Sequence, residues 1–328
     1  MTCRARRARW CSYAVAIDAG ESPADVAVLA AYLSTVGLAG CDVLIVDGSP
    51  PEQFEANGRV LRWVGRHVPA QPRHRRAGGQ VDLVRAAVDL AACEKVIVAG
   101  SDTRCTADDI TMLCALLEKH EVVEPDEYVS PTSWWSGIDA GRILLHRGIE
   151  QPGQVLSTFA LRCSAYRPLL EYEERSGDPE ARRFLSQGTD LYGARGLFIR
   201  REPPQLDRWW RRRALEAAAD FVLPLKTAFF AMLLPLVLLA ALVGGVEAAA
   251  GCAGIIGFAS VLLAAKGRAG AGKFFPLHTC LFAPLWVAER SVSVYWALID
   301  RWRGARTPVA APLTDRAGPK GVVVPGNR

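Results

Sequence analysis

The chain has 328 residues, a formal net charge of +5 and 50% hydrophobic residues. This length accommodates one large domain with an additional module. The positive charge is clustered at residues 4–9, 73–76 and 208–213, and clusters beside apolar segments suit an anionic membrane surface. No nucleic-acid-binding motif accompanies them, so no nucleic-acid partner is expected.

The N-terminal tail, residues 1–12, is basic, and the apolar stretch that follows it is too short for a signal peptide. The nine cysteines are scattered singly, without a Cys-x-x-Cys pair, and the five histidines show no metal-ligand spacing. Single cysteines within apolar periods are typical of reduced core thiols in a cytosolic compartment.

Residues 13–119 alternate between strand and helix patterns. The expected elements are strands at 13–17, 42–47 and 95–99, and helices at 22–37, 51–65, 81–92 and 106–119. Ser22 and Thr106 are expected to cap the first and last of these helices. Continuously apolar strands are buried on both faces, which indicates a parallel sheet covered by helices on both sides. We therefore predict an α/β fold with a Rossmann-like, three-layer sheet.

The pattern becomes irregular after residue 121. A helix is expected from Trp134 and Trp135, a strand at 155–163 and a short final strand at 197–200. These elements complete one predicted domain over residues 13–205.

The most apolar part of the chain is residues 227–265, where Glu247 is the only charged residue. Gly244 and Gly245 break this run near its middle. Each half has about 20 residues, the length at which a helix spans a bilayer. We therefore predict a transmembrane helical hairpin. The alternative is a buried hairpin in a soluble protein, but no domain of this chain is large enough to cover both helices.

Basic side chains flank the hairpin, in a juxtamembrane segment over residues 206–226 and again at Lys266, Arg268 and Lys273. Positively charged flanks stay in the cytoplasm. We therefore expect a multi-pass protein of the cell membrane, with its main domain cytoplasmic.

A further apolar stretch, residues 274–300, contains Glu289 and Arg290 together with several aromatic side chains. This composition favours an amphipathic helix in the membrane interface, and a third span is the alternative. The basic tail, residues 301–328, is rich in Pro and Gly and is expected to be disordered.

Acidic side chains follow the predicted strands. Asp18 comes after the first strand, Asp47 after the second, and Asp102 closes the stretch that begins at Lys95. Ligands of open α/β sheets collect at the carboxyl ends of the strands. A carboxylate there suits a divalent ion, which in turn suits a diphosphate. The pattern therefore indicates a nucleotide, with simple turn capping as the alternative for each acid.

Two further motifs follow: the pair Glu173-Glu174, and the string from Gln205 through Leu and Asp to Arg208 and Trp209. Together with the acids, this order resembles the membrane-attached, inverting family 2 glycosyltransferases of the GT-A fold. That group includes ceramide glucosyltransferase-like and polysaccharide-synthase enzymes. The resemblance extends over most of residues 13–300, and the Q-x-x-R-W string is its most specific motif.

The resemblance implies transfer of a sugar from a UDP- or GDP-sugar to a lipid or polyprenyl-linked acceptor at the cytosolic leaflet. It places Asp18, Asp47, Gln80 and Asp102 at the donor, with Asp47 at the base of the nucleotide. Asp102 would also bind the divalent metal, Mn²⁺ or Mg²⁺.

At the acceptor, the resemblance implies that Glu173 or Glu174 is the general base. The choice between the two stays open, and a solvated helix face is the alternative for both. Gln205, Arg208 and Trp209 would lie near the acceptor and the diphosphate, and Arg208 also suits a lipid headgroup.

The chain departs from the family pattern at two positions. The family usually has a run of acidic residues where this chain has Gly100-Ser101-Asp102, so that only the acid Asp102 remains. Gln80 occupies a position where relatives carry a lysine. These departures support a second hypothesis, a non-catalytic relative that serves as a membrane-bound binding or scaffold protein.

Overall fold

The protein is described by a computed structural model. The described residues are 9–17, 21–74, 81–149, 158–176, 190–207, 209–210, 213 and 224–304. The chain divides into two compact units. One comprises Met1–Gln205 with Phe258–Pro284, and the other comprises Leu206–Gly257 with Leu285–Arg328.

The first half of the first unit alternates strands and helices. Its elements are β1 (Ser12–Ile17), α1 (Pro23–Leu38), β2 (Asp42–Asp47), α2 (Pro51–Leu61), β3 (Arg66–Pro69), a 3-10 turn (Pro72–His74), α3 (Leu83–Leu90) and β4 (Lys95–Ala99). β1 pairs in parallel with β2 on one side and with β4 on the other, and β3 extends the sheet beyond β2. The predicted parallel sheet is confirmed for these four strands.

The second half adds β5 (Thr103–Arg104), α4 (Ala107–Leu116), β6 (Val122–Val129), α5 (Trp134–Ile149), β7 (Phe159–Arg162), α6 (Cys163–Ser176) and β8 (Leu191–Arg201). The complete sheet has the order β3-β2-β1-β4-β7-β6-β8-β5. β7 runs antiparallel to both of its neighbours, so the parallel arrangement predicted from residues 13–119 does not extend to the whole sheet, which is mixed.

The direction of β7 follows from where it enters the sheet. The hydroxyl groups of Thr158 and Thr103 lie 2.9 Å apart, which places the start of β7 at the carboxyl end of β4. A parallel strand would need a crossover that returns the chain to the opposite edge. Because β7 starts at the carboxyl edge, it can only run antiparallel to β4.

The core lies on both faces of the sheet. Tyr13 and Val15 of β1 pack with residues of α1 and α4, such as Leu29 and Leu113. The intervening Ala14 packs on the other face, in a cluster with residues of α3 and α6. Alternate side chains of one strand therefore pack against helices on opposite faces of the sheet, as the predicted three-layer architecture requires.

Two helix starts carry the capping pattern read from the sequence. The Ser22 hydroxyl accepts a hydrogen bond from the Asp25 amide, and the Asp25 carboxylate accepts one from the Ser22 amide. Thr106 and Asp109 form the same reciprocal pair at α4. Both arrangements satisfy amide groups that the helix itself leaves unpaired. The eight cysteines within the described residues are free thiols.

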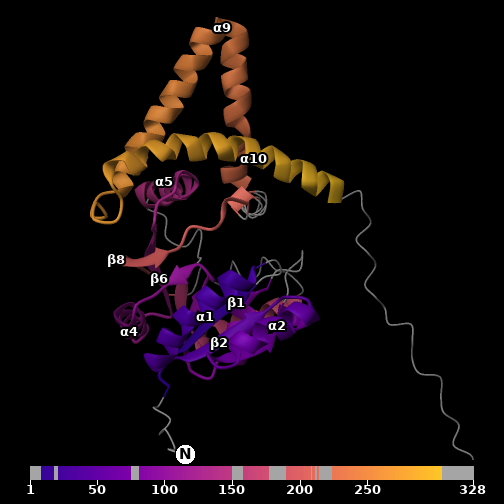
Figure 1. Cartoon of the computed structure of the whole chain (residues 1–328). Helices are drawn as coiled ribbons and strands as arrows, with labels where there is room; N and C mark the ends of the chain where they lie inside the picture. The colour runs from indigo at the N-terminus through magenta and orange to yellow at the C-terminus, as the bar shows by residue number, and fades with distance from the viewer. Residues whose placement is uncertain are drawn as a thin grey trace, which may run out of the picture. The chain divides into compact units, whose positions relative to one another are not determined.

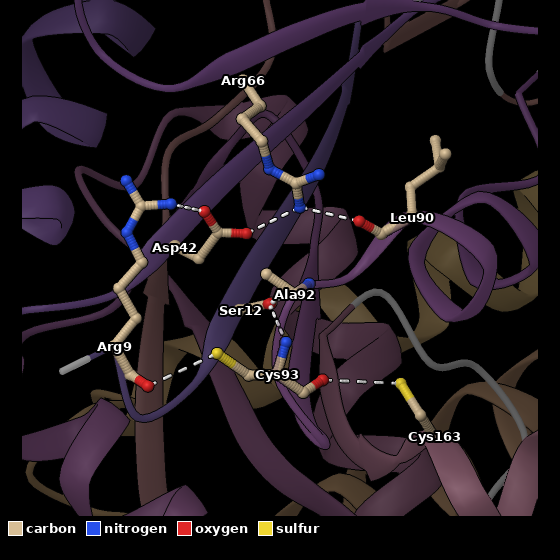
Figure 2. Close-up of polar contacts among 8 residues, drawn as sticks. All are labelled: Arg9, Ser12, Asp42, Arg66, Leu90, Ala92, Cys93 and Cys163. Carbon is tan, nitrogen blue, oxygen red and sulfur yellow. Dashed lines mark hydrogen bonds and ion pairs between the residues drawn. The ribbon is translucent and has the colours of Figure 1, made fainter.

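The amino ends of the strands are held by a buried charge (Figure 2). The fully buried carboxylate of Asp42 lies between the guanidinium groups of Arg9 and Arg66, and Arg66 also donates to the Leu90 carbonyl oxygen at 2.7 Å. A carboxylate without such partners would be costly to bury. This cluster fastens the sheet at the edge away from the carboxyl ends of the parallel strands.

The long apolar helix α9 spans Pro224–Gly267 and is interrupted at Gly245, where φ is 71° and ψ is −168°. Figure 1 shows two arms that meet at this break. Leu242, Val243 and Val246 beside the break are each more than 80% exposed. Within the described residues α9 is the one helix long and apolar enough to cross a membrane. Two separate spans stay a prediction.

In the second unit, helix α10 (Ala283–Gly304) packs on the first arm of α9. The Tyr295 hydroxyl donates to the Ala231 carbonyl oxygen, and the rings of Phe230 and Trp286 meet edge to face, with centroids 5.3 Å apart. Arg290 is buried on α10, while Val292, Trp296 and neighbouring apolar side chains are exposed. The helix therefore presents an apolar surface outward, which fits the amphipathic helix expected here.

In the first unit, the end of α5 touches the end of α9 closely. A Cβ atom at Gly148 would overlap the Leu263 carbonyl oxygen, and one at Gly267 would overlap the Leu144 carbonyl oxygen. Arg147 adds a hydrogen bond of 3.0 Å to the Gly267 carbonyl oxygen. Only glycine permits backbones to approach this closely.

We therefore expect Gly148→Ala to destabilise the chain. The added methyl group must push α5 away from α9, and overpacking of this kind costs about 1–3 kcal/mol. Thermal unfolding of the detergent-solubilised chain measures the effect as a lower Tm. Gly254→Ala is the matched control, because a Cβ atom there meets nothing within 4 Å. Equal Tm values for the two variants would contradict the close contact.

Candidate functional site

The connections of the sheet diverge at β1. The chain passes from β1 through α1 to β2 on one side, and later returns through α3 to β4 on the other side. In open α/β sheets, ligands bind in the crevice that such a reversal leaves at the carboxyl ends of the two strands. The topology therefore places the candidate site between the loops that follow β1 and β4.

A hydrogen bond joins these two loops. The Ser101 hydroxyl, after β4, donates to Glu21 Oε1, after β1, at 2.8 Å. The Glu21 backbone carbonyl oxygen accepts a hydrogen bond from the side-chain amide of Gln53 at 3.0 Å, and Glu21 itself is buried. Sequence reasoning missed Glu21, since no motif marks it. Asp18, which was predicted to bind the donor, lies outside the described residues.

Asp102 lies at the same edge and forms an ion pair. Its Oδ2 atom is 2.6 Å from the guanidinium of Arg201 at the end of β8. Its carbonyl oxygen accepts the Glu202 amide at 2.8 Å, and Thr103 is paired with Arg201 in the β5–β8 ladder. The backbone therefore holds Asp102 and Arg201 opposite each other, although 99 positions separate them.

Arg201 forms ion pairs with more than one carboxylate. A second nitrogen of its guanidinium lies 3.2 Å from Glu127 Oε2, and Asp139 adds a favourable charge interaction. Burial lowers the pKa of Arg201, but Asp102 and Glu127 outweigh it, so that the pKa lies above its ordinary value. The guanidinium is therefore permanently charged in a group of acids.

A second arginine lies beside this pair. Arg104 donates to the Ser101 carbonyl oxygen at 2.7 Å and to Glu202 Oε2 at 2.6 Å, and its guanidinium lies 4.8 Å from the centroid of the Tyr32 ring. Arginines of this kind can hold phosphate oxygens. Arg104 lies two residues after Asp102, which sequence reasoning singled out, but neither Arg104 nor its partner Glu202 was assigned a role.

Asp47 is buried at the end of β2, with three donors on its carboxylate. Its Oδ1 accepts a hydrogen bond from the Ser49 backbone amide at 2.8 Å. Its Oδ2 accepts hydrogen bonds from the Asn57 side-chain amide and from the His67 ring nitrogen Nε2, each at 2.9 Å. Burial raises the pKa of Asp47, but the hydrogen bonds from His67, Asn57 and Ser49 hold it at about 2. The residue organises its own loop, and its predicted contact with a nucleotide base stays a prediction.

The fit of a divalent ion depends on Asp102. No group of three His, Cys, Asp or Glu side chains within the described residues is arranged to hold a metal. Mg²⁺, however, is commonly bound by one or two carboxylates that share it with substrate phosphates and water. A single carboxylate at this edge therefore fits an ion that also binds a diphosphate, and would hold an ion only weakly without one.

Most of the remaining predicted site residues fall outside the described part of the structure. Gln80 and Arg208 are outside the described residues, and Glu173 and Glu174 lie near the end of α6 with their side chains outside the described part. Gln205 is exposed.

Trp209, in the second unit, is 1% exposed. Its ring centroid lies 4.4 Å from the Arg213 guanidinium and 4.9 Å from the centroid of the Trp210 ring. Its predicted role at the acceptor is therefore not that of an open stacking surface, and it stays a prediction.

We expect Asp47→Asn to lower the free energy of unfolding by about 2 kcal/mol near pH 7, because the charge stabilises the fold whenever its folded-state pKa is depressed. This contribution is present above about pH 4, near the ordinary pKa of 3.8, and is lost as the pH falls toward 2. Urea unfolding of both proteins at pH 6 and pH 3 measures it. Asp108→Asn, at an exposed position, is the control. A stability difference that does not shrink at pH 3 would contradict the assigned pKa.

No family model matches the chain, and no curated protein matches its sequence. Among solved structures, it is similar to a mannosyltransferase from Pyrobaculum calidifontis in complex with GDP-Man and Mn²⁺, at 15% identity over 88% of both chains with a TM-score of 0.47. It is also similar to 4-diphosphocytidyl-2C-methyl-D-erythritol synthase from Anaerococcus prevotii, at 11% identity over 63% of this chain and 96% of that one, with a TM-score of 0.40. A third similar structure is glucosyl-3-phosphoglycerate synthase from Mycobacterium tuberculosis with Mn²⁺ and UDP-Glc. The identity is 11% over 61% of this chain and 74% of that one, with a TM-score of 0.36. Two of these neighbours are nucleotide-sugar glycosyltransferases, but likeness this distant carries no argument about the activity of this chain.

Proposed function

We propose that the chain is a membrane-anchored, inverting glycosyltransferase of family 2 with the GT-A fold. It would transfer a sugar from a UDP- or GDP-sugar to a lipid or polyprenyl-linked acceptor. The observation that carries this proposal is the position of Asp102, at the carboxyl end of β4 beside the reversal of the sheet.

The donor occupies the crevice between the β1 and β4 loops. Asp18, Asp47 and Gln80 belong to the donor side, and the buried Asp47 keeps the loop after β2 in place through the Ser49 amide. Arg104, near Ser101, supplies positive charge to the diphosphate. These groups bind and orient the nucleotide, so that the bond from the sugar to the diphosphate faces the acceptor.

A Mn²⁺ or Mg²⁺ ion, when bound, would stabilise the negative charge of the departing diphosphate. Asp102 is the residue that would hold it. Because the described residues offer no cluster of three ligands, the ion is expected to enter together with the donor.

On the acceptor side, one carboxylate takes the proton of the attacking hydroxyl. Glu173 and Glu174 are the candidates, with Asp178 and Asp139 next. Gln205, Arg208 and Trp209 are proposed to contribute to binding the acceptor.

The acceptor is proposed to be amphiphilic because the chain carries its own membrane elements. The two arms of α9 are about 20 residues each, enough to cross a bilayer as a hairpin. The exposed Val292 and Trp296 of α10 suit the interface. With basic flanks on the cytoplasmic side, the main domain would work at the cytosolic leaflet.

A second function, a non-catalytic binding or scaffold protein, is favoured by one observation. Asp102 is paired with Arg201, and Gly100 supplies no second acid beside it. Under this alternative the chain binds a nucleotide sugar without turning it over.

Donor binding tests the metal assignment. Isothermal titration of the detergent-solubilised chain with UDP- and GDP-sugars is expected to show tighter binding in Mn²⁺ than in chelator. Asp102→Asn should remove this difference while keeping the size of the side chain, and Asp108→Asn on the exposed face of α4 should not. Equal donor affinity with and without metal in the wild-type chain would refute the assignment.

Paired glutamine variants test the base. Glutamine keeps the shape of glutamate but cannot accept a proton, so loss of the true base should slow transfer by about 10²–10⁴-fold. Glu173→Gln and Glu174→Gln serve as controls for each other, with donor affinity unchanged in both. Normal transfer by both variants would place the base elsewhere.

A further inference from the structure

The pairing of Asp102 with Arg201 is built into the backbone. β5 follows Asp102 directly and pairs antiparallel with the last residues of β8, so that Thr103 lies opposite Arg201. The Glu202 amide closes the turn on the Asp102 carbonyl oxygen. The ladder therefore keeps the two residues opposite each other, while their side chains can still change rotamer.

The same guanidinium competes for the oxygen that a metal would need. Arg201 lies 2.6 Å from Asp102 Oδ2, and both side chains are about 15% exposed. A divalent ion bound to that oxygen would lie within a few ångströms of a permanent positive charge. Like charges at such separation repel strongly where water is scarce.

Gly100 makes this pairing possible. A Cβ atom at position 100 would lie 2.5 Å from Asp102 Oδ1, which is closer than any real Cβ contact. The obstacle is the end of a side chain rather than backbone, so a methyl group at position 100 is tolerated if the Asp102 carboxylate turns away. The glycine that replaces an acid in this run therefore gives the carboxylate room to face Arg201.

We propose that Arg201 is a latch, a positioning residue that neutralises Asp102 in the empty site and yields it to a metal only when a nucleotide diphosphate arrives. The diphosphate brings the negative charge that offsets both cations, and the released guanidinium can bind its oxygens. This inference rests on the proposed function, in which Asp102 is the metal ligand. It makes metal binding conditional on the donor.

Two variants are designed to break the Asp102–Arg201 ion pair in different ways. Arg201→Gln combined with Glu127→Gln removes the guanidinium together with the charge of its second carboxylate partner. Gly100→Ala keeps every charge and displaces only the Asp102 carboxylate, so it remains informative if the double variant fails to fold. Arg200→Gln is the matched control, because Arg200 is half exposed and pairs with Glu202 instead.

Binding of Mn²⁺ alone to the detergent-solubilised full chain is measured by electron paramagnetic resonance, then repeated with UDP and with GDP. The wild-type chain and Arg200→Gln should bind Mn²⁺ weakly without nucleotide. Both latch variants should bind it about 5- to 150-fold more tightly, the usual range of coupling between sites. Adding Asp102→Asn to Gly100→Ala should abolish the gain.

The outcomes separate the latch from the function it rests on. If the wild-type chain binds Mn²⁺ with UDP or GDP but neither latch variant gains affinity without nucleotide, the latch is wrong and the metal assignment stands. If no variant binds Mn²⁺ under any condition, both are wrong. Circular dichroism verifies that each variant is folded.

Discussion

The pairing of β5 with the end of β8 is the constraint on which the candidate site depends. It brings Asp102 and Arg201, 99 positions apart in the chain, into a 2.6 Å ion pair at the carboxyl edge of the sheet. The sheet reverses its connections between β1 and β4, where α/β proteins receive ligands, and Asp102 follows shortly after β4 in the chain. A charged, nearly dry pair beside such a crevice has to be opened or neutralised before a cation can use the carboxylate.

On α10, as at the candidate site, a buried charge has a partner. On α10, Arg290 is buried, with its guanidinium 5.6 Å from the centroid of the Trp286 ring, while Val292 and Trp296 are exposed. The break of α9 at Gly245 exposes large apolar side chains on both of its sides. Such surfaces are unfavourable in water and suit contact with lipid, which would bring an amphiphilic acceptor to this chain.

Local features could be predicted from the sequence, and features that depend on distant pairing could not. β1, β2 and β4 and the caps at Ser22 and Thr106 follow from short patterns. The antiparallel direction of β7 depends on where the chain re-enters the sheet. Arg201 offered no signal, because its role comes from a register with Thr103 that no local spacing reveals. Two of the three donors on Asp47, Asn57 of α2 and His67 of β3, likewise come from other elements of the fold.

We propose that this chain transfers a sugar to an amphiphilic acceptor. The most direct measurement incubates the detergent-solubilised wild-type chain with radiolabelled UDP- and GDP-sugars, Mn²⁺ and a lipid extract, and follows both nucleoside diphosphate release and label in the organic phase. At least one donor is expected to give both signals, and omission of the lipid extract should remove the labelled product. Donor binding without diphosphate release or labelled lipid, for every donor and extract, would contradict it and favour the non-catalytic alternative.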